Sequence, residues 1–299
     1  MPDSLNNRLA ERARELGFIA IGFSPPETPP HFDHFTSWIS AQKNAGMSWM
    51  ERNIEIRKNP SLLLPGCRTI ISLAYPYSAR KPGTPDGLSV SRYSQPDRED
   101  YHYRLKGLCR DLAGMIGDRG KGMKSRICVD SAPVLERSFA HLSGMGFIGK
   151  NNMLIMPGVG SFFYLAEILT TASLDIPSIE PMANLCDSCN ACVESCPTGA
   201  LEKPFCLDAS RCLSYLTVEH KGIPHKANGR KMGDCFFGCD RCQEVCPFNG
   251  KERERNICLP SAQEFLHMEE EVFLERFGRT SFARAGFKKI KANIRLLIY

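Results

Sequence analysis

The sequence has no apolar run of the length that a membrane-spanning helix needs, which is about 18 residues. Its most apolar stretch, residues 153–170, is interrupted by Pro157, Gly158 and Glu167. A secretory signal peptide is also missing, because residues 1–17 are charged and amphipathic. These absences predict a cytoplasmic protein that does not contact a membrane.

The chain also lacks a strong overall charge. Its 38 Lys and Arg against 33 Asp and Glu give +5, which by itself indicates no class of partner. Positive charge gathers near the end, where residues 276–299 hold seven Lys or Arg and no acid. Such a segment either contacts phosphates or forms the solvated face of a helix, and the sequence leaves both open.

Cysteine is abundant, with 14 residues in 299. A disulfide framework would suit a secreted protein and is disfavoured in a cytoplasmic one. The patterned cysteines form two runs, Cys186-x-x-Cys189-x-x-Cys192-x-x-x-Cys196-Pro197 and Cys239-x-x-Cys242-x-x-x-Cys246-Pro247. This is the ligand spacing of bacterial ferredoxins with two [4Fe–4S] clusters. Zinc binding by C-x-x-C pairs is the rival interpretation, but it explains neither the four-Cys run nor the repeated Cys-Pro.

The ferredoxin pattern divides the ligands unevenly. In that pattern the Cys before Pro ligates the other cluster, so cluster 1 takes Cys186, Cys189, Cys192 and Cys246. Cluster 2 takes Cys196, Cys239 and Cys242 and lacks a fourth thiolate. Cys235 and Cys212 compete for this place, and spacing favours Cys235 only slightly. The remaining cysteines are predicted to be small buried apolar residues: Cys67, Cys109, Cys128, Cys206 and Cys258.

Helical periodicity and short apolar runs alternate over the first half of the chain, which indicates an α+β fold class. Helices are predicted over residues 5–16, 35–50, 101–116 and 134–142, and strands over 18–23, 69–75, 126–130, 152–156 and 162–169. Residues 81–87 are rich in turn formers and are predicted to form an exposed loop. We expect three parts: an α/β-type domain over 1–175, a ferredoxin-like domain over 176–255, and a basic helical tail over 256–299.

Asp130 is the acid that the sequence singles out. It is predicted at the end of a strand, before the turn Ser131-Ala132-Pro133, where side chains tend to face a cleft. Burial could hold such a carboxyl protonated and allow it to act as an acid. Alternatively, Asp130 caps the following helix. The local sequence leaves both roles open.

Several motifs in order resemble those of the epoxyqueuosine reductases, which are cobalamin-dependent iron–sulfur enzymes of tRNA modification. The resemblance covers residues 57–249 and rests on Leu64-Pro65-Gly66, Asp100-Tyr101-His102, Val129-Asp130-Ser131-x-Pro133-x-Leu135-Glu136-Arg137, Gly146-Phe147-Ile148-Gly149-Lys150, Cys212-Leu213-Ser214-Tyr215-Leu216-Thr217-x-Glu219 and Phe237-Gly238-Cys239-Asp240-x-Cys242-Gln243.

The resemblance implies a site. Asp130 would be the catalytic acid, Cys212 would complete cluster 2, and His102 and Lys150 would lie nearby. A base-off cobalamin would lie between the first domain and the clusters. The residues that would contact it are Arg57, Asp130, Ile155, Ser214 and Tyr215.

The implied reaction is a two-electron reduction of epoxyqueuosine at the wobble position of a tRNA anticodon stem-loop. It removes the epoxide oxygen as water and leaves queuosine. An external low-potential donor of the flavodoxin or ferredoxin type would feed the clusters. Many members of the family carry a further helical-repeat domain that helps to bind tRNA, so we expect a short form here, acting as a monomer.

Two other functions fit part of the sequence. Reductive dehalogenases share cobalamin and two clusters, but they typically carry an export signal that is not seen here. A non-catalytic electron carrier would account for the cysteines and would leave the motifs around Asp130 and Lys150 unexplained.

Overall fold

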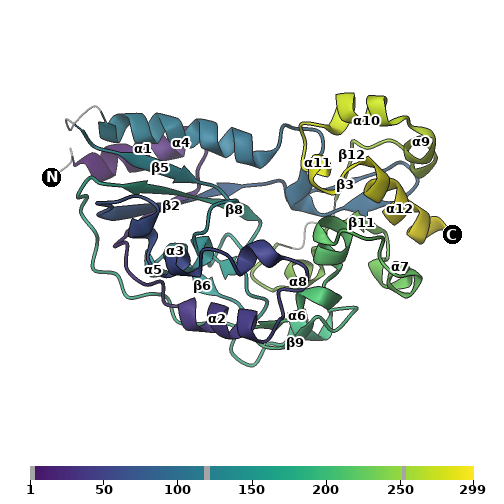
Figure 1. The fold of residues 1–299 in the computed structure, drawn as a ribbon, viewed down its shortest axis with the longest axis horizontal. Helices are drawn as coiled ribbons and strands as arrows, with labels where there is room; N and C mark the ends of the chain where they lie inside the picture. The colour runs from purple at the N-terminus through teal and green to yellow at the C-terminus, as the bar shows by residue number, and fades with distance from the viewer. Residues whose placement is uncertain (1–3, 118–121, 251–253) are drawn as a thin grey trace.

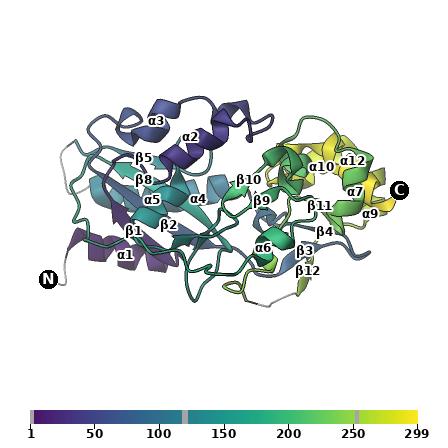
Figure 2. The same ribbon diagram turned by 90° about the horizontal axis from the view of Figure 1, so that it is seen from below.

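The computed structural model describes residues 4–117, 122–250 and 254–299. The molecule is elongated, with the two termini at opposite ends (Figures 1 and 2). No helix within these residues is both long and apolar enough to span a bilayer.

An antiparallel four-stranded sheet forms the N-terminal half, with strand order β1-β2-β8-β5. The strands are β1 (Ala20–Ser24), β2 (Thr69–Pro76), β5 (Ser125–Cys128) and β8 (Phe163–Thr170). Helices α1 (Leu5–Glu15) and α4 (Tyr101–Gly117) cover one face, while α2 (Phe32–Ser40), α3 (Ile54–Lys58) and α5 (Glu136–Leu142) lie on the other (Figure 1). Because both faces are covered, the central strands β2 and β8 are almost continuously apolar and buried.

A second four-stranded sheet joins distant parts of the chain, in the order β11-β4-β3-β12. Strands β3 (Lys81–Gly83) and β4 (Ser89–Val90) pair with β11 (Cys235–Phe237) and β12 (Arg255–Ile257). The exposed loop predicted over residues 81–87 is therefore wrong at its start, where Pro82 and Gly83 are buried in the sheet. Turn-forming residues obscured β3, which pairs with the nearby β4 and, far along the chain, with β12, where Lys81 lies opposite Arg255.

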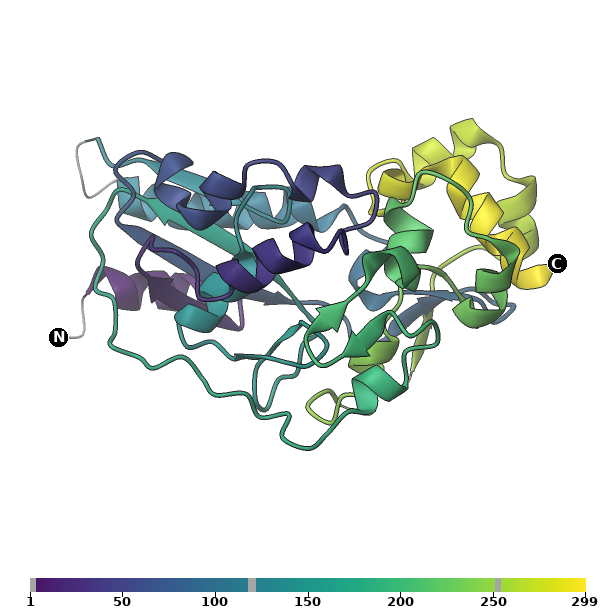
Figure 3. The ribbon, with the colours of Figure 1, turned by 60° about the horizontal axis from the view of Figure 1, so that its bottom comes forward.

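The iron–sulfur region is built from short elements. They are α6 (Ala191–Glu194), the hairpin β9 (Leu201–Lys203) and β10 (Cys206–Leu207), a π-helical turn η5 (Tyr215–Glu219), α7 (Lys226–Met232) and α8 (Arg241–Glu244). Helix α2 lies against the hairpin (Figure 3). Trp38 Nε1 donates to the carbonyl of Leu207 at 2.6 Å, and His34 Nε2 contacts the carbonyl of Phe205 at 2.9 Å.

The C-terminal segment is helical, as predicted. Helices α9 (Ala262–His267), α10 (Glu270–Phe277), α11 (Phe282–Ala285) and α12 (Phe287–Ile298) follow one another. They close over a separate aromatic core with Phe236, Phe265 and Phe282 at its centre. This tail is thus packed on one side and is not a helix solvated all round.

Two predicted elements are shorter than expected. The helix predicted over 35–50 ends at Ser40, because Gln42 and Ala45 adopt positive φ angles that a helix cannot include. The strand predicted over 152–156 is reduced to β7 (Leu154–Ile155), which pairs with β6 (Phe147–Ile148).

Candidate functional site

Asp130 sits at the apex of a tight turn just beyond β5. The amide of Ser131 donates to the carbonyl of Val129 at 2.5 Å, and Asp130 has a φ of 55°, which is strained for a residue with a Cβ. The alternative role of helix cap is wrong. Helix α5 begins after Leu135 with no side-chain cap, so the Asp130 carboxylate is free for other partners.

Three side chains converge on Asp130 Oδ2. Tyr101 Oη donates at 3.1 Å, His102 Nε2 lies at 3.2 Å, and Arg284 Nη1 lies at 3.4 Å. The other ring nitrogen of His102, Nδ1, contacts Asp100 Oδ1 at 2.6 Å. The result is a carboxylate–imidazole–carboxylate chain at the start of α4, with an arginine of the tail completing it.

The electrostatics of this chain place the proton on the imidazole. Burial disfavours charge on Asp130, but the His102 hydrogen bond and the Arg284 charge outweigh it and lower its pKa to about 2. Burial also opposes charge on His102, yet its bonds to Asp100 and Asp130 raise its pKa to about 9. The expectation that burial keeps Asp130 protonated is therefore wrong, because its side chain is 46% exposed and the cations beside it dominate.

Arg284 was not singled out from the sequence. Its Nε also pairs with Glu219 Oε1 at 2.5 Å, so it links the tail, η5 and Asp130. The sequence signal for this residue was the basic composition of the tail, which does not indicate which of its cations contacts Asp130.

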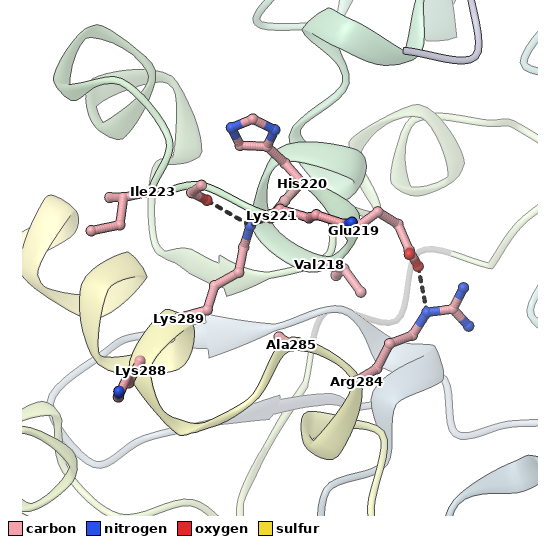
Figure 4. A pocket seen from close by; sticks show the side chains of 10 residues that line it. Val218, Glu219, His220, Lys221, Ile223, Arg284, Ala285, Lys288 and Lys289 are labelled. Carbon is pink, nitrogen blue, oxygen red and sulfur yellow. Dashed lines mark hydrogen bonds and ion pairs between the residues drawn. The ribbon is translucent and has the colours of Figure 1, made fainter. Parts of the chain in front are cut away.

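A hollow of about 360 Å³ opens beside Arg284 (Figure 4). It lies between η5 with the loop after it and the α11–α12 segment, and Lys288 and Lys289 are on its wall. Lys289 Nζ donates to the carbonyls of His220 and Gly222, and burial lowers its pKa to about 8. Lys288 is exposed, so its charge is available to a ligand. The hollow is suited to an anion.

The four cysteines expected for cluster 1 line one hollow of about 50 Å³: Cys186, Cys189, Cys192 and Cys246. Ile155 and Lys150 also line it. Lys150 Nζ donates to the carbonyls of Asp187 and Cys189 at 2.6 and 2.8 Å, and its amide donates to the sulfur of Cys186 at 3.5 Å. Lys150 thus holds the cysteine loop in shape.

The four thiols expected for cluster 2 act on one another electrostatically. Burial raises the pKa of Cys239 to about 11, and Cys212 contributes through its charge. Burial likewise raises the pKa of Cys242, and the charges of Cys239 and Cys212 add to this shift. Burial also raises the pKa of Cys212, and the charge of Cys196 contributes. Within the described residues no three His, Cys, Asp or Glu side chains gather around a single-ion position. The four thiolate ligands of a [4Fe–4S] cluster lie further apart than the ligands of a single ion, because each binds a different iron.

Cys235 has a different environment from Cys212. It is 6% exposed in β11, and its thiol donates to the carbonyls of Phe237 and Gly238 at 3.4 and 3.5 Å. Cys212 instead packs in one apolar cluster with Cys239. The surroundings favour Cys212 as the fourth ligand, against the slight preference from spacing.

The remaining expected cofactor contacts lie on three elements. Arg57, in α3, is 7% exposed, with its guanidinium 5.4 Å from the Phe35 ring centre, and its Nε has no partner among the described residues. Ser214 and Tyr215 begin the π-helical turn next to Cys212, and Tyr215 Oη accepts from the amide of Gly46 at 2.9 Å. Ile155 is in β7, beside the cluster 1 hollow.

Comparison with known proteins matches two segments of the chain to family models. A family model described as "Epoxyqueuosine reductase QueG, DUF1730" matches residues 57–131, and one described as "4Fe-4S double cluster binding domain" matches residues 185–249. The curated epoxyqueuosine reductase of Cellulophaga algicola is 32% identical over 299 residues, which cover 95% of each chain.

Two solved structures share this architecture. An epoxyqueuosine reductase with a tRNA-Tyr epoxyqueuosine-modified stem loop matches with a TM-score of 0.87 and 31% identity, over 98% of this chain and 80% of that one. The Bacillus subtilis epoxyqueuosine reductase, solved with its catalytic aspartate loop swung out of the active site, matches with a TM-score of 0.86 and 30% identity, over 98% of this chain and 81% of that one.

Proposed function

This chain belongs to the epoxyqueuosine reductase family, and we propose that it reduces epoxyqueuosine in tRNA to queuosine. Two electrons and two protons convert the epoxide to an alkene and release the oxygen as water. The observation that carries the chemistry is the Asp130–His102–Asp100 chain, which supplies an acid beside a domain for two iron–sulfur clusters.

The proton starts on His102, because this imidazole keeps its charge up to a pH of about 9. Asp130 accepts the hydrogen bond from His102 Nε2 and is the group that presents a proton to the departing oxygen. When a substrate anion draws Arg284 away from Asp130, the carboxylate loses a neighbouring cation and its pKa rises. Substrate binding would thereby favour transfer of the proton from His102 to Asp130.

Two [4Fe–4S] clusters supply the electrons. We assign Cys186, Cys189, Cys192 and Cys246 to cluster 1. Cys196, Cys212, Cys239 and Cys242 are assigned to cluster 2. Cys189 is exposed, so electrons from an external flavodoxin- or ferredoxin-type donor would enter at cluster 1.

Cobalamin is the further cofactor that we propose, and Arg57 supports it. A buried guanidinium N–H without a partner is costly, and an acceptor on a corrin side chain would satisfy it. Arg57, Asp130, Ile155, Ser214 and Tyr215 would hold this cofactor. When bound, it supplies a low-potential cobalt centre for reduction of the ring.

The substrate would be a tRNA anticodon stem-loop with epoxyqueuosine at the wobble position. The hollow beside Arg284 is suited to a phosphate of that RNA, because Lys288 and Arg284 line it and phosphate contacts dominate the affinity of proteins for nucleic acids. We propose a cytoplasmic enzyme that acts as a monomer.

The test is nucleoside mass spectrometry of tRNA from a deletion strain of the source organism, carrying either the wild-type chain or Asp130→Asn. We expect epoxyqueuosine to accumulate in the deletion strain and in the strain with Asp130→Asn. Wild type should restore queuosine. Purified Asp130→Asn should keep its iron, because Asp130 ligates neither cluster, and its corrinoid, because Asn preserves the size of this one contact and the other four residues are unchanged. Normal queuosine in the deletion strain would exclude this function, and full activity of Asp130→Asn would remove the role of Asp130.

A further inference from the structure

A carboxyl group is buried at the centre of the first sheet. Glu167, in β8, is 0% exposed and lies opposite Ser72 of β2 and Cys128 of β5. Neither of its oxygens has a hydrogen-bond donor among the described residues, and the Ser72 hydroxyl is also unpaired there. A buried carboxylate with neither donor nor cation would be very unfavourable, so Glu167 needs another explanation.

The group that faces Glu167 is a second carboxyl. Glu136 is the first residue of α5, which packs across β2 and β8, and its carboxyl group faces that of Glu167, so that the two can hydrogen-bond only if one of them is protonated. Ionised carboxylates only accept hydrogen bonds, so this contact requires a proton on one of them. Burial raises the pKa of Glu136 to about 8, with the Asp130 charge adding to it, and burial together with the Glu136 charge also raises the pKa of Glu167.

Glu136 also holds the turn that carries Asp130. Its Oε1 accepts the backbone amide of Asp130 at 2.6 Å. Since Asp130 has a strained positive φ, its turn depends on contacts of this kind to keep its shape. The chain of contacts thus runs from Glu167 through Glu136 to the Asp130 amide, while the Asp130 carboxylate points to His102.

We propose that Glu136 and Glu167 share a proton and act as positioning residues that hold Asp130 against His102. The shared proton removes one of the two negative charges that the pair would otherwise place inside the sheet, and Glu136 still offers an oxygen to the Asp130 amide. The positioning role rests on the proposed function of Asp130, whereas the shared proton does not.

The pair has a predictable effect on stability. The charged or titratable groups around it are Asp130, Arg57, Arg137, Cys109 and Cys128. Burial raises the pKa of each cysteine to about 12, so the cysteines stay neutral while the pair titrates. A raised carboxyl pKa means that the folded state binds a proton that the unfolded state releases. The contribution of the pair to the free energy of unfolding is therefore complete at acidic pH and is lost as pH rises through about 8.

The first experiment tests the shared proton without any assay of activity. In Glu167→Gln the amide donates to Glu136, so no shared proton is needed. We expect the melting temperature of the wild type to fall more steeply between pH 6 and pH 9 than that of Glu167→Gln. The matched control Glu271→Gln, on an exposed face of α10, should behave as wild type. Equal slopes of melting temperature against pH in wild type and Glu167→Gln would refute the proposal of a shared proton.

The second experiment tests the positioning of Asp130. Glu136→Leu removes the acceptor, so kcat should fall by about tenfold or more while KM stays unchanged. Glu136→Gln keeps an acceptor and should retain kcat within a few-fold, which separates positioning from a loss of packing. An unchanged kcat in Glu136→Leu, or an equal loss in Glu136→Gln, would refute the positioning role. If Glu136→Leu does not fold, the Glu136→Gln result decides.

Discussion

At the scale of single residues, the acids of one short motif behave in opposite ways. Asp130, whose side chain is 46% exposed, is ionised because His102 and Arg284 stabilise its charge, whereas Glu136, six residues later, is half-buried against another carboxyl and resists ionisation. Residue type does not decide this difference, because the neighbours come from α4, α11 and β8. The motif therefore combines an ionised carboxylate with a carboxyl group whose pKa is raised.

The fourth ligand of cluster 2 gives a prediction at the same scale. Cys212→Ser should remove a thiolate from the cluster, so that iron content falls by about half and the visible absorption weakens accordingly. The matched change Cys235→Ser should leave iron content unaltered, because that thiol is engaged with backbone carbonyls of its own strand. Iron analysis and anaerobic spectra of the two variants would decide, and the reverse pattern would assign Cys235 to the cluster.

At the scale of elements, the C-terminal helices have two functions. Phe282 and Ile290 bury one side of the segment, while Arg284 reaches Asp130 and Lys288 faces the hollow. Of the two interpretations of this basic segment, a helix solvated on all sides is wrong, and phosphate contact stays a prediction. Its charges include an arginine that contacts Asp130 and Glu219, and lysines beside a hollow.

Salt dependence of tRNA binding tests the hollow. Lys288→Gln should reduce the slope of log affinity against log salt by about one if this lysine neutralises a phosphate. Arg295→Gln is the matched control, since this exposed residue lies further along the same helix and does not line the hollow. Binding of an epoxyqueuosine-containing stem-loop would be measured at several salt concentrations. An unchanged slope for Lys288→Gln would mean that the hollow does not take a phosphate.

At the scale of the whole molecule, the site depends on contacts between distant parts of the chain. Asp130 follows a strand of the first sheet, and His102 begins a helix beside that sheet. Arg284 comes from the tail, which the second sheet ties to residues 81–90 through β11. The tail is therefore expected to influence both stability and the active site.

Phe282→Ala tests this dependence. Phe282 is 0% exposed among the rings of Phe236, Phe237 and Phe277, so its truncation should lower the free energy of unfolding by about 3–5 kcal/mol. Activity at low temperature should fall as well, because Arg284 is two residues away. Phe287→Ala, at a partly buried ring, should cost less. Denaturant unfolding followed by fluorescence would measure the free energy of unfolding of both variants. An equal loss of stability in the two would contradict the central place of Phe282 in this core.

The sequence by itself determined the features that depend on local spacing. Two cysteine runs specify thiolate ligands because cluster loops need a fixed number of residues between ligands, and periodicity located most helices and buried strands. The ordered motifs also indicated the family, and with it Asp130 as a functional residue.

Only the tertiary structure decided the features that depend on distant neighbours. The pairing of β3 with β12, the contact of Arg284 with Asp130 and the contact of Glu136 with Glu167 join residues far apart in the sequence. The ionisation of Asp130 belongs to the same group, because a pKa is set by nearby charges and solvent, and local sequence does not specify either.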